Sequence, residues 1–125
     1  MKLAVLVTGM GGVGVNVGRK FVDEGYEVVF YDLVPRRGID FLEEVKDRIE
    51  FVRGDVLDLP YLLEIVVKHD VEGIIHTAII YPLTIETPDS VFRIAVEGTK
   101  NVLEVARLRD LKVVFLSSEA VYGPQ

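Results

Sequence analysis

The first 32 residues contain the pattern that most constrains how this chain can fold. A short apolar run at residues 3–7 leads into Gly-Met-Gly-Gly-Val-Gly at residues 9–14, and a helix-like stretch follows to about Glu24. A second apolar run, at residues 28–31, ends in Asp32. Strand, glycine-rich turn, helix and strand in this order predict a βαβ unit whose two strands are parallel.

The spacing of the glycines predicts a dinucleotide site at the start of the helix. Gly9 allows a tight turn after the first strand, Gly11 lets a pyrophosphate approach the backbone, and Gly14 lets the helix pack against the strand. The free N–H groups of the helix would then face the phosphates. Asp32 follows Gly14 by 18 residues, close to the roughly 20 expected for the acid that binds the adenosine ribose. Two alternatives stay open: a glycine-rich turn without a ligand, and another nucleotide-like ligand such as S-adenosylmethionine.

Apolar runs alternate with helical patterns along the rest of the chain. Further strands are expected at residues 49–52, 71–76 and 112–116. This alternation predicts an α/β fold, a three-layer doubly wound parallel sheet of the Rossmann type with strand order 3-2-1-4-5. A ligand would lie across the carboxyl ends of the first and fourth strands, where the strand order reverses.

Capping residues mark where the expected helices begin. Asp58 precedes a helix with Pro60 in its first turn, and Thr87 precedes the longest helix, residues 88–109. Gly18 lies inside the first helix, where glycine costs about 1 kcal/mol relative to alanine. We therefore interpret Gly18 as a point of close contact between helix and strand.

Length and charge restrict the class of protein. A chain of 125 residues makes one domain, and the absence of cysteine excludes disulfides and thiolate metal sites. A net charge of −6 disfavours general nucleic-acid binding. No apolar run approaches the roughly 18 residues of a membrane span, and the N-terminus lacks the pattern of a signal peptide. We expect a soluble cytoplasmic protein that binds a small ligand and neither nucleic acid nor membrane.

Five short segments carry a resemblance to a known family. They are Thr-Gly at residues 8–9, Gly-Asp-Val-Leu-Asp at 54–58, Ile-Ile-His-Thr-Ala at 74–78, Val-Glu-Gly-Thr-Lys-Asn-Val-Leu-Glu at 96–104, and Ser-Ser-Glu-Ala-Val-Tyr-Gly at 117–123. Together they resemble the N-terminal part of the extended short-chain dehydrogenase/reductase family, the NAD-dependent epimerases and dehydratases of nucleotide sugars. The resemblance implies NAD as cofactor, a nucleotide sugar as substrate, and a homodimer through the long helix.

The chain departs from the family pattern in three places. Its glycines are spaced Gly-x-Gly-x-x-Gly, one residue shorter than the usual Gly-x-x-Gly-x-x-Gly, and Ala95 replaces an asparagine of the long helix. No tyrosine has a lysine four positions later, so the catalytic Tyr-x-x-x-Lys pair of the family is missing. We therefore interpret residues 1–125 as a single NAD(P)-binding domain, truncated before that pair and before the substrate domain.

The fingerprint and the resemblance together predict the cofactor-binding residues. We expect NAD rather than NADP because Asp32 would repel a 2′-phosphate, although Arg36 and Arg37 could accommodate one. The resemblance places Asp55 at the adenine edge; both acids have a second interpretation as turn-stabilising residues. No metal site is expected. The full set of predicted cofactor-binding residues is Gly9, Gly11, Gly12, Val13, Gly14, Asp32, Asp55, Val56, Thr77, Ala78 and Ser117.

The resemblance assigns the one catalytic candidate, Ser118, to hydrogen bonding with the reacting hydroxyl or carbonyl group. Its alternative is a serine that caps a turn. His76 is more simply a strand-end histidine than a ligand or an acid/base, and His69 a cation at a helix C-terminus. The charged residues of the long helix form a solvated face unless a dimer covers them. Residues 79–88 either contact the substrate or pack on the surface.

Two functions are compatible with these observations. The first is the NAD-binding portion of a nucleotide-sugar epimerase or dehydratase, in which the full-length parent transfers hydride between a sugar hydroxyl carbon and NAD. The second is a non-catalytic NAD(P)-binding module, or a truncated product, that binds without turnover.

Overall fold

The chain folds around a parallel sheet with the predicted strand order. The computed structural model describes residues 3–35, 39–78, 87–117 and 119–124. Within these residues a five-stranded sheet has the order β3-β2-β1-β4-β5, and every neighbouring pair is parallel. Its strands are β1 (Ala4–Thr8), β2 (Glu27–Asp32), β3 (Ile49–Arg53), β4 (Val71–His76) and β5 (Lys112–Phe115).

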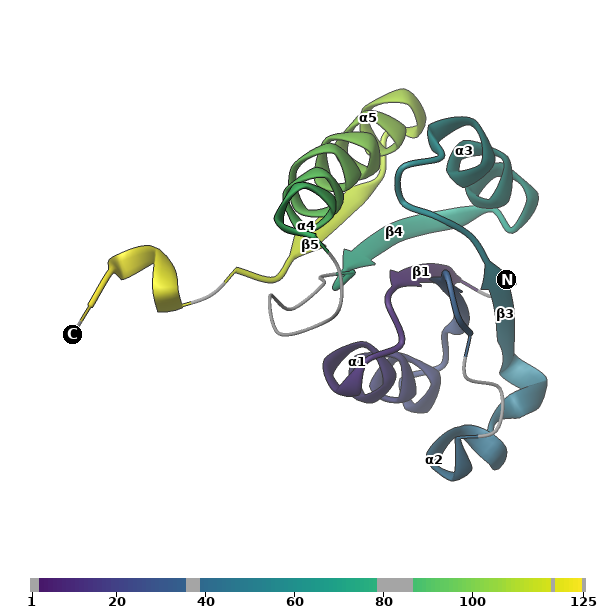
Figure 1. Cartoon of the computed structure of the whole chain (residues 1–125). Coiled ribbons are helices and arrows are strands. Elements are labelled where there is room, and N and C mark those ends of the chain that lie inside the picture. Colours follow the sequence, from purple (N-terminus) through teal and green to yellow (C-terminus); the bar gives the residue numbers. More distant parts are fainter. Residues whose placement is uncertain (1–2, 36–38, 79–86, 118, 125) are drawn as a thin grey trace.

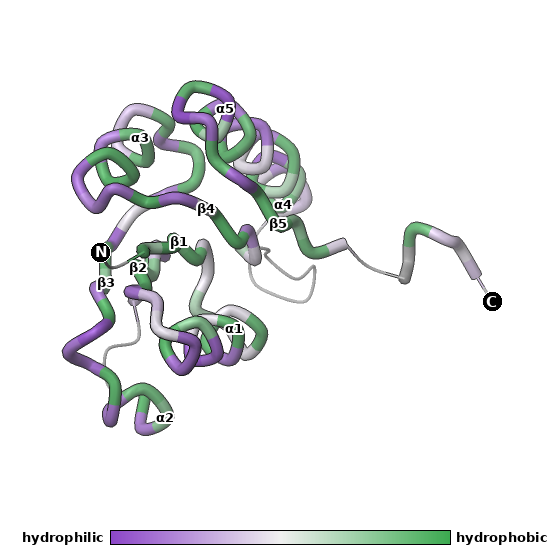
Figure 2. The backbone as a smooth tube through the Cα atoms, turned by 180° about the vertical axis from the view of Figure 1, so that it is seen from behind, coloured by the Kyte–Doolittle hydropathy of each residue, from purple (hydrophilic) through white to green (hydrophobic). Residues whose placement is uncertain are grey.

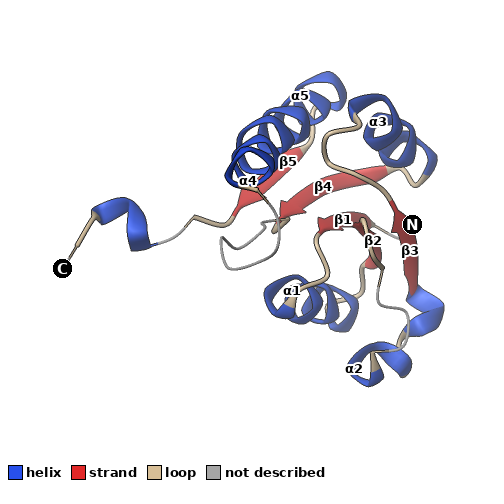
Figure 3. Ribbon diagram, viewed as in Figure 1, coloured by secondary structure: helices blue, strands red, loops and turns tan. Residues whose placement is uncertain are grey.

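Helices cover both faces of this sheet (Figure 1). On one face lie α1 (Gly12–Asp23) and the short α2 (Asp40–Glu43). On the other lie α3 (Leu59–Lys68), α4 (Pro88–Arg93) and α5 (Thr99–Arg109) (Figure 3). The predicted three-layer α/β architecture is therefore confirmed.

The two faces bury separate apolar cores because successive strand residues point to opposite sides. All five residues of β1 are buried. Val5 and Val7 pack on the α1 side, whereas Leu6 packs on the side of α3 and α5. Such a strand is apolar without alternation because neither face meets water. Figure 2 shows β1 as largely hydrophobic and the helices as mixtures of both kinds of residue.

Gly18 is the point of close helix–strand contact that the sequence predicts. A Cβ atom at this position would overlap the Phe30 ring of β2. Phe30 is fully buried and stacks on Phe51, with 6.1 Å between the ring centroids. The ring therefore occupies the space that a larger residue at position 18 would need.

Both predicted N-caps are confirmed. The Asp58 side chain accepts a hydrogen bond from Tyr61 N at 3.1 Å, and the Thr87 hydroxyl accepts one from Ser90 N at 3.2 Å. The start of the first helix differs from the expectation, because α1 begins at Gly12, inside the glycine-rich turn itself.

The long helix is not one continuous α-helix as expected. Residues Ile94–Gly98 form a π-helical segment between α4 and α5. A π turn closes its hydrogen bonds over five residues instead of four, and such turns are frequent at functional sites. Two 3₁₀ turns, Lys46–Arg48 and Glu119–Tyr122, complete the described structure. No helix among the described residues has the length and apolar character needed to span a membrane.

Candidate functional site

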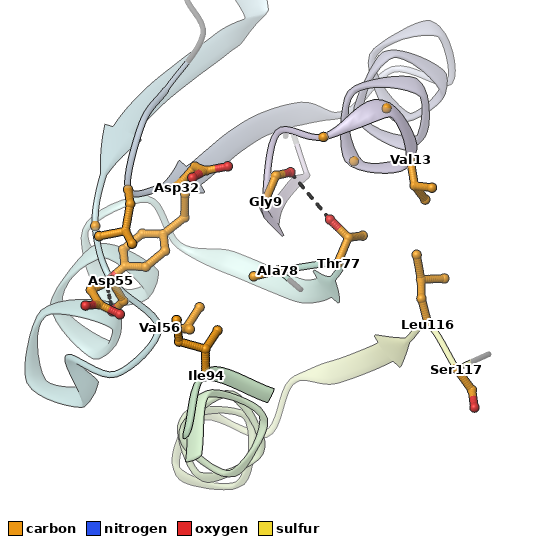
Figure 4. A pocket seen from close by; sticks show the side chains of 16 residues that line it. Gly9, Val13, Asp32, Asp55, Val56, Thr77, Ala78, Ile94, Leu116 and Ser117 are labelled. Carbon is orange, nitrogen blue, oxygen red and sulfur yellow. Dashed lines mark hydrogen bonds between the residues drawn. The ribbon is translucent and has the colours of Figure 1, made fainter. Parts of the chain in front are cut away.

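A cavity of about 520 Å³ lies at the carboxyl edge of the sheet. It is bounded by the strand ends of β1, β2, β4 and β5, the N-terminus of α1, and the loop after β3 (Figure 4). All the predicted cofactor-binding residues line it, from Gly9 to Ser117. The fold thus brings together side chains and backbone from six separate parts of the chain. The lining residues are Gly9, Gly11, Gly12, Val13, Gly14, Tyr31, Asp32, Leu33, Gly54, Asp55, Val56, Thr77, Ala78, Ile94, Leu116 and Ser117.

The glycine-rich turn is tight where the sequence predicts it. Gly9 has φ of +88°, a conformation that side chains rarely adopt, and its N–H donates to Tyr31 O at 2.9 Å. At Gly14 a Cβ atom would overlap the carbonyl oxygen of Gly9 and lie 2.9 Å from Thr77 Oγ1. Glycine at position 14 therefore lets α1 begin directly against the ends of β1 and β4.

The N-terminus of α1 is open toward the cavity. Its N-cap is Gly11, which makes no side-chain capping bond, and the first turn holds no acidic residue. A Cβ atom at Gly11 or Gly12 would meet nothing within 4 Å. The first N–H groups of a helix lack intrahelical acceptors and carry the positive end of its dipole. The arrangement suits an anion such as a phosphate.

Asp32 connects the end of β2 to the glycine-rich turn. Its Oδ2 accepts a hydrogen bond from Met10 N at 2.6 Å, and its Oδ1 accepts one from Val34 N at 3.2 Å. Asp32 thus stabilises the glycine-rich turn, as one of its two interpretations predicts. A carboxylate has about four acceptor positions, and the described residues occupy two of those on this half-buried side chain, which lines the cavity.

Three hydrogen bonds hold the loop that carries Asp55 and Val56, one within the loop and two from β2 and α5. Asp55 Oδ1 accepts from Leu57 N at 2.9 Å, and Tyr31 Oη donates to Asp55 O at 2.9 Å. Asn101 Nδ2, from α5, donates to Val56 O at 2.9 Å. Burial, followed by the nearby carboxylates of Asp58 and Asp55, raises the pKa of the Tyr31 phenol above its usual value. Tyr31 therefore stays a neutral hydrogen-bond donor.

Thr77 and Ala78 form the floor of the cavity beyond β4. Thr77 Oγ1 donates to the carbonyl oxygen of Thr8 and lies 3.4 Å from that of Gly9, the contact drawn in Figure 4. The N–H groups of Thr77 and Ala78 both donate to Thr8 Oγ1, at 3.0 and 3.2 Å. The end of β4 and the start of the glycine-rich turn are thus tied together by Thr8.

His76 is a buried, hydrogen-bonded histidine at the end of β4. Its Nδ1 lies 2.7 Å from Thr8 Oγ1 and its Nε2 lies 3.0 Å from Thr99 Oγ1. Burial lowers the pKa of its imidazole from the usual value. The described part of the chain holds no group of three or more residues arranged to bind a metal ion. His69 is the C-cap residue of α3.

Other predicted features lie outside the described residues or on the surface. Ser118, Arg36, Arg37 and the loop 79–86 are outside the described residues. On the long helix, exposed ion pairs join Arg93 to Glu97 at 3.8 Å and Arg107 to Glu104 at 2.6 Å. These pairs fit the predicted solvated face.

Sequence reasoning missed five lining residues. Four of them are direct sequence neighbours of predicted residues, so extending each predicted segment by one residue would have included them: Tyr31, Leu33, Gly54 and Leu116. The fifth, Ile94, enters the cavity from the start of the π segment. Nothing in its local pattern distinguishes it from an ordinary apolar helix residue.

Comparisons with known proteins agree with this geometry. A family model described as NAD dependent epimerase/dehydratase family matches residues 5–125. A UDP-N-acetyl-alpha-D-glucosaminuronate decarboxylase from Bacillus cytotoxicus is 30% identical over 98% of this chain and 39% of its own length. Cinnamoyl-CoA reductase 2 from Medicago truncatula is 35% identical over 91% of this chain and 34% of its own length.

A solved structure supports the same assignment. The crystal structure of UDP-glucose 4-epimerase from Brucella ovis in complex with NAD superimposes with a TM-score of 0.78 at 31% identity. The match covers 98% of this chain and 38% of that one. The chain thus spans well under half the length of the relatives it matches.

Proposed function

Because the chain belongs to the NAD-dependent epimerase/dehydratase family, we propose that its cavity binds NAD as the cofactor for hydride transfer at a nucleotide-sugar hydroxyl. The chain matches the N-terminal, NAD-binding portion of nucleotide-sugar epimerases and dehydratases. The observation that carries the proposal is the cavity at the carboxyl edge of the sheet, where the strand order reverses between β1 and β4. The sugar substrate belongs to the whole protein and is inferred from the family.

Each part of NAD has a matching group in the cavity. The open N-terminus of α1 suits the pyrophosphate, and the carboxylate of Asp32 suits the ribose hydroxyls of the adenosine half. The fixed loop of Asp55 and Val56 would line the adenine. Thr77, Ala78 and Ser117 would then lie toward the nicotinamide half.

We infer a preference for NAD over NADP from the position of Asp32. Two backbone N–H groups hold its carboxylate at the cavity wall. A 2′-phosphate on the ribose would bring like charges together at this point, which destabilises binding. The same carboxylate accepts hydrogen bonds from the unmodified ribose.

The chemistry of hydride acceptance would come from NAD itself, which accepts a hydride from the carbon that carries the sugar hydroxyl. The chain's own residues would bind and orient the dinucleotide. By resemblance, Ser118 would hydrogen-bond the reacting oxygen. None of the 125 residues forms a Tyr-x-x-x-Lys pair, so we propose that these residues bind NAD without turning over a sugar by themselves.

Calorimetric titration of the chain with NAD and then with NADP tests the proposal. We expect saturable binding of NAD and weaker binding of NADP. Asp32→Asn removes the negative charge but keeps the size of the side chain, and should weaken NAD binding about tenfold or more, as for a lost hydrogen bond to a charged group. The matched control is Asp40→Asn at the exposed start of α2, which should bind as the wild type does.

Two outcomes would refute this proposal. Absence of saturable binding of both dinucleotides to the folded chain would remove the cofactor assignment. Tighter binding of NADP than of NAD would overturn the role of Asp32.

We also propose that the long helix forms a homodimer interface, as the resemblance implies. The helix exposes Phe92, Val96 and Leu103. Val96 and Leu103, together with Phe115 of β5, line a shallow groove between the helix and the edge strand. Leu103→Glu should shift the mass measured by light scattering from dimer toward monomer, whereas Leu108→Glu, outside the groove, should leave it unchanged. A monomeric wild-type chain at high concentration would contradict this assignment.

A further inference from the structure

Three side chains connect the cavity floor to the long helix through hydrogen bonds. His76 of β4 stands between Thr8 of β1 and Thr99 of α5, at 2.7 Å and 3.0 Å from their hydroxyl oxygens. Thr8 Oγ1 also receives the N–H groups of Thr77 and Ala78. Thr99 Oγ1 donates to Ala95 O, inside the π segment, at 2.6 Å.

The donors in this network determine which nitrogen of His76 carries the hydrogen. A hydroxyl has one hydrogen to donate and two lone pairs with which to accept. The N–H of Ala78 and the N–H of Thr77, which is shared with Thr8 O at 3.1 Å, point at the two lone pairs of Thr8 Oγ1, so the hydroxyl hydrogen is left for His76 Nδ1. Nδ1 is therefore an acceptor, and Nε2 carries the hydrogen in the neutral ring.

The other end of the network leads to the same assignment. The hydrogen of the Thr99 hydroxyl is used by Ala95 O, which leaves a lone pair for His76 Nε2–H. The hydroxyls of Thr8 and Thr99 and both ring nitrogens of His76 then all have hydrogen-bond partners. No buried side-chain nitrogen or oxygen among the described residues lacks a hydrogen-bond partner.

We propose that neutral His76, with its hydrogen on Nε2, is a positioning residue for the cofactor cavity. It orients the Thr8 hydroxyl, which in turn holds the backbone of Thr77 and Ala78 against the start of the glycine-rich turn. Protonation of the ring disrupts this arrangement and weakens dinucleotide binding. The part of the inference that concerns binding rests on the proposed function above.

Protonation disrupts the network because Thr8 has no free lone pair. An imidazolium ring donates from both nitrogens, so Nδ1–H would point at an oxygen that already accepts two hydrogen bonds. Thr8 Oγ1 would have to release one of the two backbone N–H groups and turn its own hydrogen elsewhere; the Thr77 N–H would keep its bond to Thr8 O, whereas the Ala78 N–H would lose its bond to the hydroxyl. The released group belongs to Thr77 or Ala78, both of which line the cavity.

Among the residues that the structure describes, none of the side chains in contact with the ring carries a charge that would stabilise an imidazolium. Thr8 faces it from β1, Thr99 from α5, and Phe115 from β5 with 6.0 Å between ring centroids. None of these side chains titrates or carries a charge near neutral pH. Among the described residues, burial alone shifts the pKa of His76.

The first test needs no ligand. Imidazole nitrogen shifts, measured by NMR on the full chain during a pH titration, report the tautomer and the pKa of each histidine. The chain has two histidines, and His69→Asn assigns the signals. We expect His76 with hydrogen on Nε2 and a pKa below the usual 6.5. A ring with hydrogen on Nδ1, or an imidazolium at pH 7, would overturn the assignment.

The second test measures NAD affinity between pH 5.5 and pH 8 under conditions where the chain stays folded. Below the pKa measured for His76, wild-type affinity should fall by up to about tenfold per pH unit, as for one linked proton. His76→Asn places an amide near Nδ1 without a titrating group, and should abolish this slope. His69→Asn is the matched control and should keep it.

The outcomes separate the two proposals. Affinity that is independent of pH across the measured titration of His76 overturns its positioning role. Failure of NAD to bind at any pH refutes the proposed function, while the nitrogen shifts still decide the arrangement of the network. A pH slope that survives in His76→Asn also overturns the inference, because another group would then be responsible.

Discussion

Replacing Gly14 with alanine should damage the fold and the cavity together. A Cβ atom at this position would overlap the carbonyl oxygen of Gly9 and lie 2.9 Å from Thr77 Oγ1. The Gly9 carbonyl is backbone inside a turn and cannot rotate away as the end of a side chain can. The start of α1 would have to move away from the ends of β1 and β4.

Two opposing effects set the magnitude. Overpacking of a filled site costs about 1–3 kcal/mol, and glycine to alanine in a helix gains about 1 kcal/mol at most. The gain is smaller here because position 14 lies in the first turn of the helix. We therefore expect a net loss of about 1–2 kcal/mol in the free energy of unfolding, together with a loss of NAD affinity.

Gly18→Ala is the matched comparison for Gly14→Ala, because it makes the same substitution one helical turn further along α1. There the Cβ would overlap the ring of Phe30, a side chain in the core. Its free energy of unfolding should fall by a similar amount, but NAD affinity should change much less. Lys20→Ala, exposed on the same helix, should stay within about 0.5 kcal/mol of wild type.

Urea unfolding followed by circular dichroism measures the free energies, and calorimetry measures NAD binding to the folded variants. If the slope of the unfolding free energy against urea concentration is the same in the variant as in the wild type, the variant differs in stability and not in the compactness of its unfolded state. Wild-type stability with wild-type affinity in Gly14→Ala would refute the argument that α1 must begin against the turn. Equal affinity losses in Gly14→Ala and Gly18→Ala would refute the separation of core from cavity.

Two further predictions follow from the tyrosine and the histidine beneath the cavity. Tyr31→Phe removes the donor to Asp55 O without changing the ring, and should lower the free energy of unfolding by about 0.5–1.5 kcal/mol in urea titrations; unchanged stability would mean that the loop is held by its other contacts. Because burial lowers the folded-state pKa of His76, the unfolded chain takes up its proton first as the pH falls. Stability from this group is therefore complete above about pH 6.5 and decreases below it, by at most about 1.4 kcal/mol per pH unit, until the folded-state pKa is reached. Thermal unfolding between pH 5.5 and 7.5 should show this slope in wild type and a reduced slope in His76→Asn, and equal slopes would contradict the prediction.

Local signals were sufficient for most of the fold. Apolar runs placed the strands, and Asp58 and Thr87 placed two helix starts, because each depends on residues within one turn of the chain. The cavity lining was predictable for a similar reason. In a parallel sheet with this alternation, residues that directly follow the strands meet at one edge.

Features that depend on contacts between distant segments were not predictable. The π segment between α4 and α5 keeps the same apolar and polar composition as an ordinary helix, so no pattern marked it. The role of Thr8 depends on backbone N–H groups 69 and 70 positions away in the sequence. The sequence presents a turn residue and a ribose ligand as alternatives for Asp32, whereas the structure shows its carboxylate holding the turn while it lines the cavity.

The π segment has a consequence for how the two halves of the long helix are oriented. Successive residues of an α-helix are about 100° apart around its axis, so the wider turn at Ile94–Gly98 changes the angular phase between α4 and α5. Ile94 thereby reaches the cavity while Thr99 still meets His76. An ordinary α-helix through all of these residues would have another phase between α4 and α5, and would rotate one of these contacts out of place. The backbone path of this stretch is therefore part of the cavity as much as the glycine-rich turn is, although Ile94 itself lies outside the motif at residues 96–104.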